Sequence, residues 1–241
     1  MGRVVILGLD GLEYNLVERF NLKTLMQLEY GETRLDGFEE PLQTPILWRS
    51  FIMGALPEGW MMKNHIFMYA EKSWAISVPG YNEWVEFQPV RAGLSRCIIE
   101  KLDPTRYLQA CWDLYRKKKT ITLNLLERGG WDLFMSHIFL SDLVGHWICY
   151  DNTAMYDLYR EMSKLTEEVK KRMNPEDFLL IISDHGLYWD EKRYGGWGQH
   201  SNHGFYSINE KLGLKNPHLT DFYEVIIQKL RSHKKGERRE A

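Results

Sequence analysis

The chain has 241 residues, of which 44% are hydrophobic and 27% are charged, and this length suits one α/β domain. Its 31 basic and 33 acidic residues give a net charge of −2, which argues against a nucleic-acid binder that depends on phosphate contacts. The cysteines, Cys97, Cys111 and Cys149, provide neither a disulfide framework nor a Cys-Cys zinc motif, and we expect buried thiols in a reducing compartment.

The first predicted element is a buried strand over residues 3–9, an apolar run that ends at Asp10 and Gly11. This run is too short for a signal peptide or a membrane anchor. Nowhere does the chain reach the roughly 18 consecutive apolar residues of a transmembrane helix. We therefore expect a cytoplasmic protein with no membrane-spanning segment.

The middle of the chain predicts a loop and a helix over residues 41–54, and then a helix over 106–128 that leads into a second buried strand at 132–140. Residues 58–95 are rich in aromatic side chains and methionine and have little periodicity. We interpret them as loops with one strand near 74–78, and as an insertion that shapes a substrate pocket.

Residues 152–172 predict a helix, because apolar side chains recur there at helical spacing, and a third buried strand follows at 178–182. Strands that alternate with helices favour a doubly wound α/β sheet. We assign residues 1–232 to a single domain. Residues 233–241 are charged and lack an apolar anchor, so we expect a frayed, solvated C-terminal tail.

An acidic residue closely follows each of the three buried strands: Asp10, Asp142 and Asp184. In open α/β sheets, ligands bind outside the carboxyl ends of the strands, so these carboxylates are expected to converge on one edge. An aspartate in such a position is also typical of a turn or a helix N-cap. Three of them, two with histidines nearby, favour a functional site instead.

Histidines accompany two of these aspartates. Asp142 and His146 are four residues apart, so on a helical turn both side chains lie on one face and can share a metal ion, although this pair alone is common and mostly structural. Asp184 and His185 directly follow a buried strand. An unpaired buried charge would cost several kcal/mol there, so a counter-ion is expected.

A glycine-flanked segment near the end of the chain adds His200 and His203, either of which could complete the set. Read alone, this segment is equally consistent with a surface loop. Oxygen and nitrogen ligands without thiolate favour zinc, manganese or iron over calcium. Six such ligands are enough for two divalent ions, which lie about 4 Å apart in two-metal sites.

Thr44 is the candidate nucleophile. It precedes Pro45, which suits the first turn of a helix, and its simplest interpretation is that of an N-cap. The same geometry places the hydroxyl at a helix N-terminus, which favours anions. A metal there would lower the pKa of the hydroxyl enough for attack on phosphorus.

Five short blocks span most of the chain: residues 7–11, Thr44 with Trp48, Gly54 and Pro57, Asp142 with His146, residues 183–186, and residues 198–204. In this order they resemble the alkaline phosphatase superfamily, in particular its type I phosphodiesterase/nucleotide pyrophosphatase branch. Residues 219–230 are similar to the closing helix of that family. The resemblance implies a three-layer α/β/α fold with a mostly parallel central sheet.

The resemblance also implies that Thr44 forms a covalent phosphothreonine, which water later hydrolyses. Two divalent ions, zinc before manganese or iron, would be held by Asp10, Thr44, Asp142, His146, Asp184, His185 and His200. One ion would take Asp10, Asp184 and His185, with Thr44 bridging toward it, and the other would take Asp142, His146 and the last histidine. His203, followed directly by Gly204, is the alternative last ligand, but Gly198 before His200 and residues 205–206 after it fit the family better.

We therefore expect a metal-dependent phosphohydrolase, a phosphodiesterase or nucleotide pyrophosphatase, that acts on a small phosphate ester or a nucleotide. A threonine at position 44 argues against a sulfatase, which needs an aldehyde made from cysteine or serine. The alternatives are a phosphomonoesterase, for which Arg49 could supply the extra cation, and a non-catalytic metal- or phosphate-binding relative. No nucleic-acid-specific or membrane partner is expected, and the sequence leaves the oligomeric state open.

Overall fold

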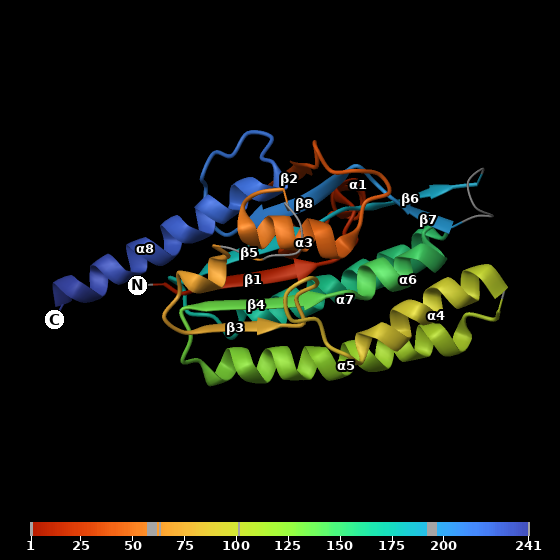
Figure 1. The fold of residues 1–241 in the computed structure, drawn as a ribbon, viewed down its shortest axis with the longest axis horizontal. Helices are drawn as coiled ribbons and strands as arrows, with labels where there is room; N and C mark the ends of the chain where they lie inside the picture. The colour runs from red at the N-terminus through yellow and green to blue at the C-terminus, as the bar shows by residue number, and fades with distance from the viewer. Residues whose placement is uncertain (1, 57–61, 63, 101, 192–196, 241) are drawn as a thin grey trace.

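The structure, a computed structural model, describes residues 2–56, 62, 64–100, 102–191 and 197–240. Within these residues, a six-stranded sheet has the strand order β2-β8-β5-β1-β4-β3, and β6 and β7 form a separate two-stranded sheet (Figure 1). The strands are β1 Val4–Leu9, β2 Glu29–Arg34, β3 Ser73–Ile76, β4 Leu133–Ile138, β5 Phe178–Ser183, β6 Leu187–Asp190, β7 Trp197–His200 and β8 His203–Ile208.

Four neighbouring strands of the large sheet are parallel. Strand β1 pairs in parallel with β4 and β5, and β3 pairs in parallel with β4. Strand β8 is antiparallel to both β5 and β2. The prediction of an α/β protein with a mostly parallel sheet is confirmed. Because β1, β4 and β5 run in the same direction, their carboxyl ends lie at one edge of the sheet, where ligands bind in such folds.

Helices cover both faces of this sheet. Val5 and Leu7 of β1 belong to a core that includes side chains of α5, α6 and α7, whereas Val4 and Ile6 belong to a second core with side chains of α3 and α8 (Figure 1). The helices are α1 Tyr14–Arg19, α2 Lys23–Met26, α3 Thr44–Met53, α4 Phe87–Glu100, α5 Thr105–Arg128, α6 Leu140–Ile148, α7 Asn152–Lys170 and α8 Phe222–Glu240. In the described part of the chain, none of them combines the length and apolar character needed to cross a membrane.

The segment 58–95 differs from the prediction at its end. Residues 57–61 and 63 lie outside the described residues. Strand β3 fits the predicted strand, but helix α4 begins at Phe87 within the segment interpreted as loops. Its apolar side chains recur at helical spacing: Phe87, Val90, Leu94 and Cys97. Pro89 and Gly93 obscure this pattern in the sequence, because both residues usually interrupt helices.

The C-terminal segment also differs from the prediction. Helix α8 agrees with the predicted closing helix but continues through residues 233–240, which were expected to be frayed. Lysine, arginine and glutamate dominate this segment, and all three are good helix formers. Charge without an apolar anchor therefore does not end the helix here.

Candidate metal centre

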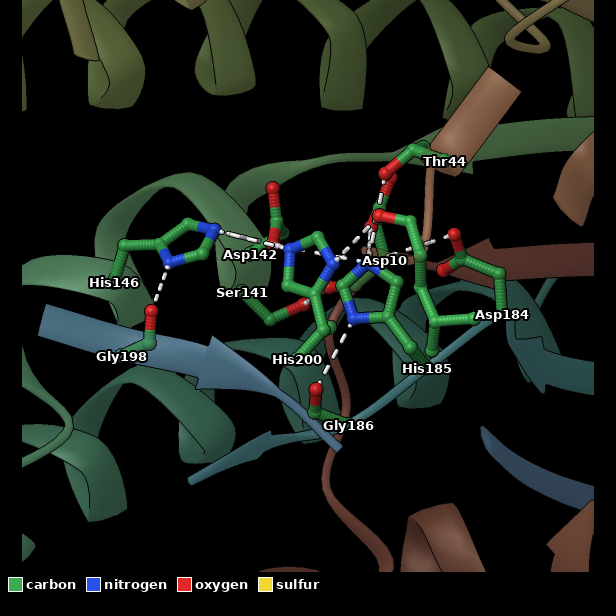
Figure 2. A network of polar contacts seen from close by, with 12 residues as sticks. Asp10, Thr44, Ser141, Asp142, His146, Asp184, His185, Gly186, Gly198 and His200 are labelled. Carbon is green, nitrogen blue, oxygen red and sulfur yellow. Dashed lines mark hydrogen bonds and ion pairs between the residues drawn. The ribbon is translucent and has the colours of Figure 1, made fainter. Parts of the chain in front are cut away.

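Three carboxylates meet where the parallel strands end (Figure 2). Asp10 directly follows β1, Asp142 lies in the first turn of α6 after β4, and Asp184 directly follows β5. The approach of α6 to β1 depends on Gly11, whose φ is 71° and where a Cβ atom would lie 2.7 Å from the Cα atom of Asp142. Only glycine adopts this conformation readily and leaves this space. The strand ends thus bring together carboxylates that are far apart in sequence.

The other predicted residues surround these carboxylates. His146 lies one turn after Asp142 on α6, and its Nε2 atom is 3.1 Å from Asp142 Oδ1. His200 ends β7, and its Nε2 atom is 3.5 Å from the same oxygen. Thr44 Oγ1 is 3.5 Å from Nε2 of His185. All seven predicted site residues therefore lie in one cluster (Figure 2).

Two overlapping groups within this cluster could hold a metal ion. In each group the ligand atoms lie within 4.8 Å of one another: Asp142, His146 and His200 in the first, and Asp10, Asp142 and His185 in the second. Asp184 lies beside the second group, with Oδ2 3.6 Å from Nε2 of His185. Asp142 belongs to both groups, whereas the family resemblance assigns it to one ion.

The three clustered histidines are held in one tautomer. Each forms an Nδ1 hydrogen bond to a backbone carbonyl: His146 to Gly198 at 2.7 Å, His185 to Gly186 at 3.1 Å and His200 to Leu42 at 3.2 Å. Because a carbonyl can only accept, each Nδ1 carries a proton, and each Nε2 of a neutral ring presents a lone pair to the cluster. Metal-binding histidines in proteins are typically held in this way.

Two of these lone pairs face each other directly. The Nε2 atoms of His146 and His200 are 3.2 Å apart, and a positive charge between them, either a proton or a metal ion, would relieve their repulsion. Burial lowers the pKa of His146, but the Asp142 carboxylate outweighs this effect and raises it. Burial and the neighbouring His200 lower the pKa of His185 to about 4, so this ring is neutral near pH 7.

Several buried carboxylate oxygens have no hydrogen-bond partner among the described residues: Oδ1 of Asp10, Oδ1 of Asp142, and both oxygens of Asp184. Burial, followed by the charges of Asp10 and Asp142, raises the pKa of Asp184 well above its usual value. Burial and Asp142 raise the pKa of Asp10 to about 6. Ionised carboxylates are costly in such surroundings unless a cation compensates them, and the available oxygen and nitrogen atoms suit a divalent metal.

Thr44 occupies the N-terminus of α3, although not as its N-cap. Gln43 is the N-cap, and Thr44 is the first helical residue, followed by Pro45. The Thr44 side chain is 8% exposed, and its hydroxyl lies beside the unprotonated nitrogen of His185. The positive end of the helix dipole therefore lies next to both the hydroxyl and the candidate metal ligands.

His203 lies outside both ligand groups. Its Nε2 atom is 2.9 Å from Oε1 of Glu13, and Ser201 donates a hydrogen bond of 2.8 Å to Oε2 of the same carboxylate. Burial raises the pKa of Glu13, but its bonds to His203 outweigh this effect and lower it. Glu13 therefore fixes the segment between β7 and β8, and it was not among the residues predicted from the sequence. The sequence feature that could have indicated Glu13 is its position, a charged residue three positions after Asp10.

His137 of β4 is a second residue near the cluster that was not predicted from the sequence. It is 1% exposed, and its Nε2 atom is 2.8 Å from Oδ2 of Asp10. The sequence signal for it was a histidine within a mostly apolar strand, because a buried polar side chain needs a partner.

No protein-family model matches this chain, and no curated protein matches its sequence. The likeness to the alkaline phosphatase superfamily therefore stays a prediction from the sequence blocks. The structure itself contributes a cluster of carboxylates and imidazoles that could hold a metal ion.

Proposed function

We propose that this protein is a metal-dependent phosphohydrolase, a phosphodiesterase or nucleotide pyrophosphatase with a three-layer, alkaline-phosphatase-like fold. Its cofactors are two divalent ions, with zinc preferred over manganese or iron. Its substrate is a small phosphate ester or a nucleotide, and its location is the cytoplasm.

One observation carries the proposal. Three imidazole rings, each with Nδ1 hydrogen-bonded to a backbone carbonyl, lie beside a threonine hydroxyl (Figure 2). Several buried carboxylate oxygens that have no hydrogen-bond partner among the described residues lie with them. A purely structural cluster would pair these atoms with donors, because unpaired buried acceptors destabilise a fold. Two cations would pair them and would leave the hydroxyl of Thr44 beside the ions.

The proposed chemistry divides between the ions and the chain. When bound, the ions act as Lewis acids that offset the negative charge of the phosphoryl group. Thr44 Oγ1 forms a bond to phosphorus and loses its proton, while the bond to the leaving oxygen breaks and that oxygen takes up a proton. Water then cleaves the phosphothreonine and restores Thr44. The N-terminus of α3 faces the phosphate with its positive end.

Arg49 bears on whether the substrate is a diester or a monoester. A monoester carries one more negative charge, and Arg49 was the candidate cation for it. The Arg49 side chain is buried, and its stem packs against Gly80, where a Cβ atom would lie 2.4 Å from Arg49 Cγ. This packing gives Arg49 a role in holding the loop between β3 and α4 against α3.

Turnover of chromogenic substrates tests the proposal. Protein stripped with a chelator and reloaded with zinc, manganese or iron is assayed with bis(4-nitrophenyl) phosphate and 4-nitrophenyl phosphate. We expect metal-dependent hydrolysis, faster with the diester, and we expect Thr44→Ala to keep its metal and lose hydrolysis. Thr120→Ala, an exposed threonine on α5, is the matched control.

Each outcome has a definite meaning. Full activity of Thr44→Ala would remove Thr44 from the mechanism. Bound metal without turnover of either ester would favour a non-catalytic metal-binding protein. Absence of metal binding, measured by elemental analysis after dialysis against zinc, would refute the proposal as a whole.

A further inference from the structure

His137 lies beneath the candidate metal centre, in the interior of the sheet. It pairs with Gly8 in the parallel register of β1 and β4, two residues before Asp10. The side chain is 1% exposed, so the protein and not solvent must satisfy its polar atoms.

The two carboxylate oxygens of Asp10 have different surroundings. Oδ2 is 2.8 Å from Nε2 of His137. Oδ1 has no hydrogen-bond partner among the described residues, and it lies 3.4 Å from Nε2 of His185, on the side of the metal-binding group. One oxygen is therefore engaged with the protein, and the other is directed at the cluster.

Trp48 packs against the His137 ring. The two rings pack edge to face, with centroids 5.0 Å apart at 76°. Gly8 makes room for this indole, since a Cβ atom there would lie 2.6 Å from Cη2 of Trp48. Trp48 is four residues after Thr44 on α3, and residues at this spacing share a helix face. The same helix thus carries the candidate nucleophile and fixes the ring that binds Asp10.

We propose that His137 is a positioning residue of the metal centre, which occupies Oδ2 of Asp10 so that Asp10 binds its metal ion through Oδ1 alone and in a fixed direction. This inference rests on the proposed function, because it takes Asp10 as a metal ligand. Hydrogen-bond partners of metal-binding carboxylates commonly orient them in this way.

A calorimetric zinc titration tests the inference. Purified protein is first stripped of metal with a chelator, and the heat of zinc binding is then measured. His137→Phe keeps a buried ring but removes the N–H donor, whereas His137→Gln keeps an N–H donor. For a partner of a metal ligand, we expect His137→Phe to weaken one zinc site by about 10- to 100-fold and to leave the other site unchanged. His137→Gln should restore most of this loss. His65→Phe, a histidine outside the cluster, should bind zinc like the wild type.

Trp48→Phe provides a second, independent test of the positioning role if His137→Phe does not fold. It loosens the packing of the His137 ring without altering Asp10, and a smaller loss at the same zinc site is expected. Unchanged affinity at both sites in folded variants, or an equal loss at both sites that glutamine does not reduce, would overturn the positioning role. A wild-type protein that binds no zinc would instead refute the proposed function.

Discussion

The substitution Asp10→Asn should have opposite effects on stability without and with metal. Burial and the neighbouring Asp142 raise the pKa of Asp10 from 3.8 to about 6. A carboxyl whose pKa is higher in the folded state destabilises the fold when ionised, and this cost appears as the pH rises through about 4 to 6. At about 1.4 kcal/mol for each pKa unit, the full cost is about 3 kcal/mol above pH 7.

Asparagine removes this charge and keeps an oxygen that can accept from His137. At pH 8 in the presence of a chelator, we therefore expect Asp10→Asn to raise the free energy of unfolding by up to about 3 kcal/mol. At pH 4 this gain should largely disappear, because the wild-type carboxyl is then protonated in the folded state.

Zinc should reverse the relative stability of the wild type and Asp10→Asn. An ion at a concentration about 1,000 times its dissociation constant stabilises the folded protein by about 4 kcal/mol. The wild type gains this stabilisation, whereas Asp10→Asn loses a ligand and most of the gain. Zinc should therefore make the wild type the more stable of the two.

Urea denaturation of both proteins, with chelator and with zinc at pH 8, measures the four free energies. Asp157→Asn, at an exposed aspartate on α7, is the control. It should change the free energy of unfolding by no more than about 0.5 kcal/mol, both with chelator and with zinc. If Asp10→Asn is less stable than the wild type in chelator at pH 8, the assignment of an uncompensated buried charge is wrong. Equal stabilisation of both proteins by zinc would exclude Asp10 as a ligand.

Three further predictions concern other residues. Lys118 is fully buried, and its Nζ atom has no hydrogen-bond partner among the described residues. Burial lowers the pKa of Lys118 to about 7. The charged side chain therefore destabilises the fold fully below pH 7, and this destabilisation fades as the pH rises toward 10.5. Lys118→Met should therefore stabilise the protein by as much as about 5 kcal/mol at pH 7 and by little at pH 10, as thermal denaturation at the two values would reveal; a gain independent of pH would contradict this. His200→Ala should remove one zinc ion per chain in elemental analysis, whereas His203→Ala should retain both; the opposite result would exchange their roles. Gly11→Ala should destabilise the chain by several kcal/mol in urea and weaken zinc binding, because both its positive φ and its contact with α6 exclude a methyl group; wild-type behaviour would refute the packing argument.

The positions of the candidate ligands could be predicted because they depend on a simple rule of sheet geometry. Apolar runs that end at Asp10 and Asp184 identify parallel strands, and such strands end at one edge. The helical spacing of Asp142 and His146 was likewise visible in the sequence. The choice between His200 and His203 needed the structure, because it depends on which of them Glu13 engages.

The supporting contacts could not be predicted in the same way. The bond of His137 to Asp10 depends on the register between β1 and β4, which involves residues 127 positions apart. Helix α4 was missed because Pro89 and Gly93 interrupt its pattern, although tertiary packing of its apolar face outweighs their low helix propensity. Local sequence patterns contain neither kind of information.

The carbonyl that orients His200 belongs to Leu42, two residues before Thr44. The segment that delivers the hydroxyl therefore also sets the direction of an imidazole from the far end of the chain. Shortening or lengthening this connection by one residue would misalign both at once. The placement of the Thr44 hydroxyl and the orientation of the His200 ring can therefore change during evolution only together. Natural variants of this protein should keep the segment from Leu42 to Thr44 unchanged even where neighbouring loops differ.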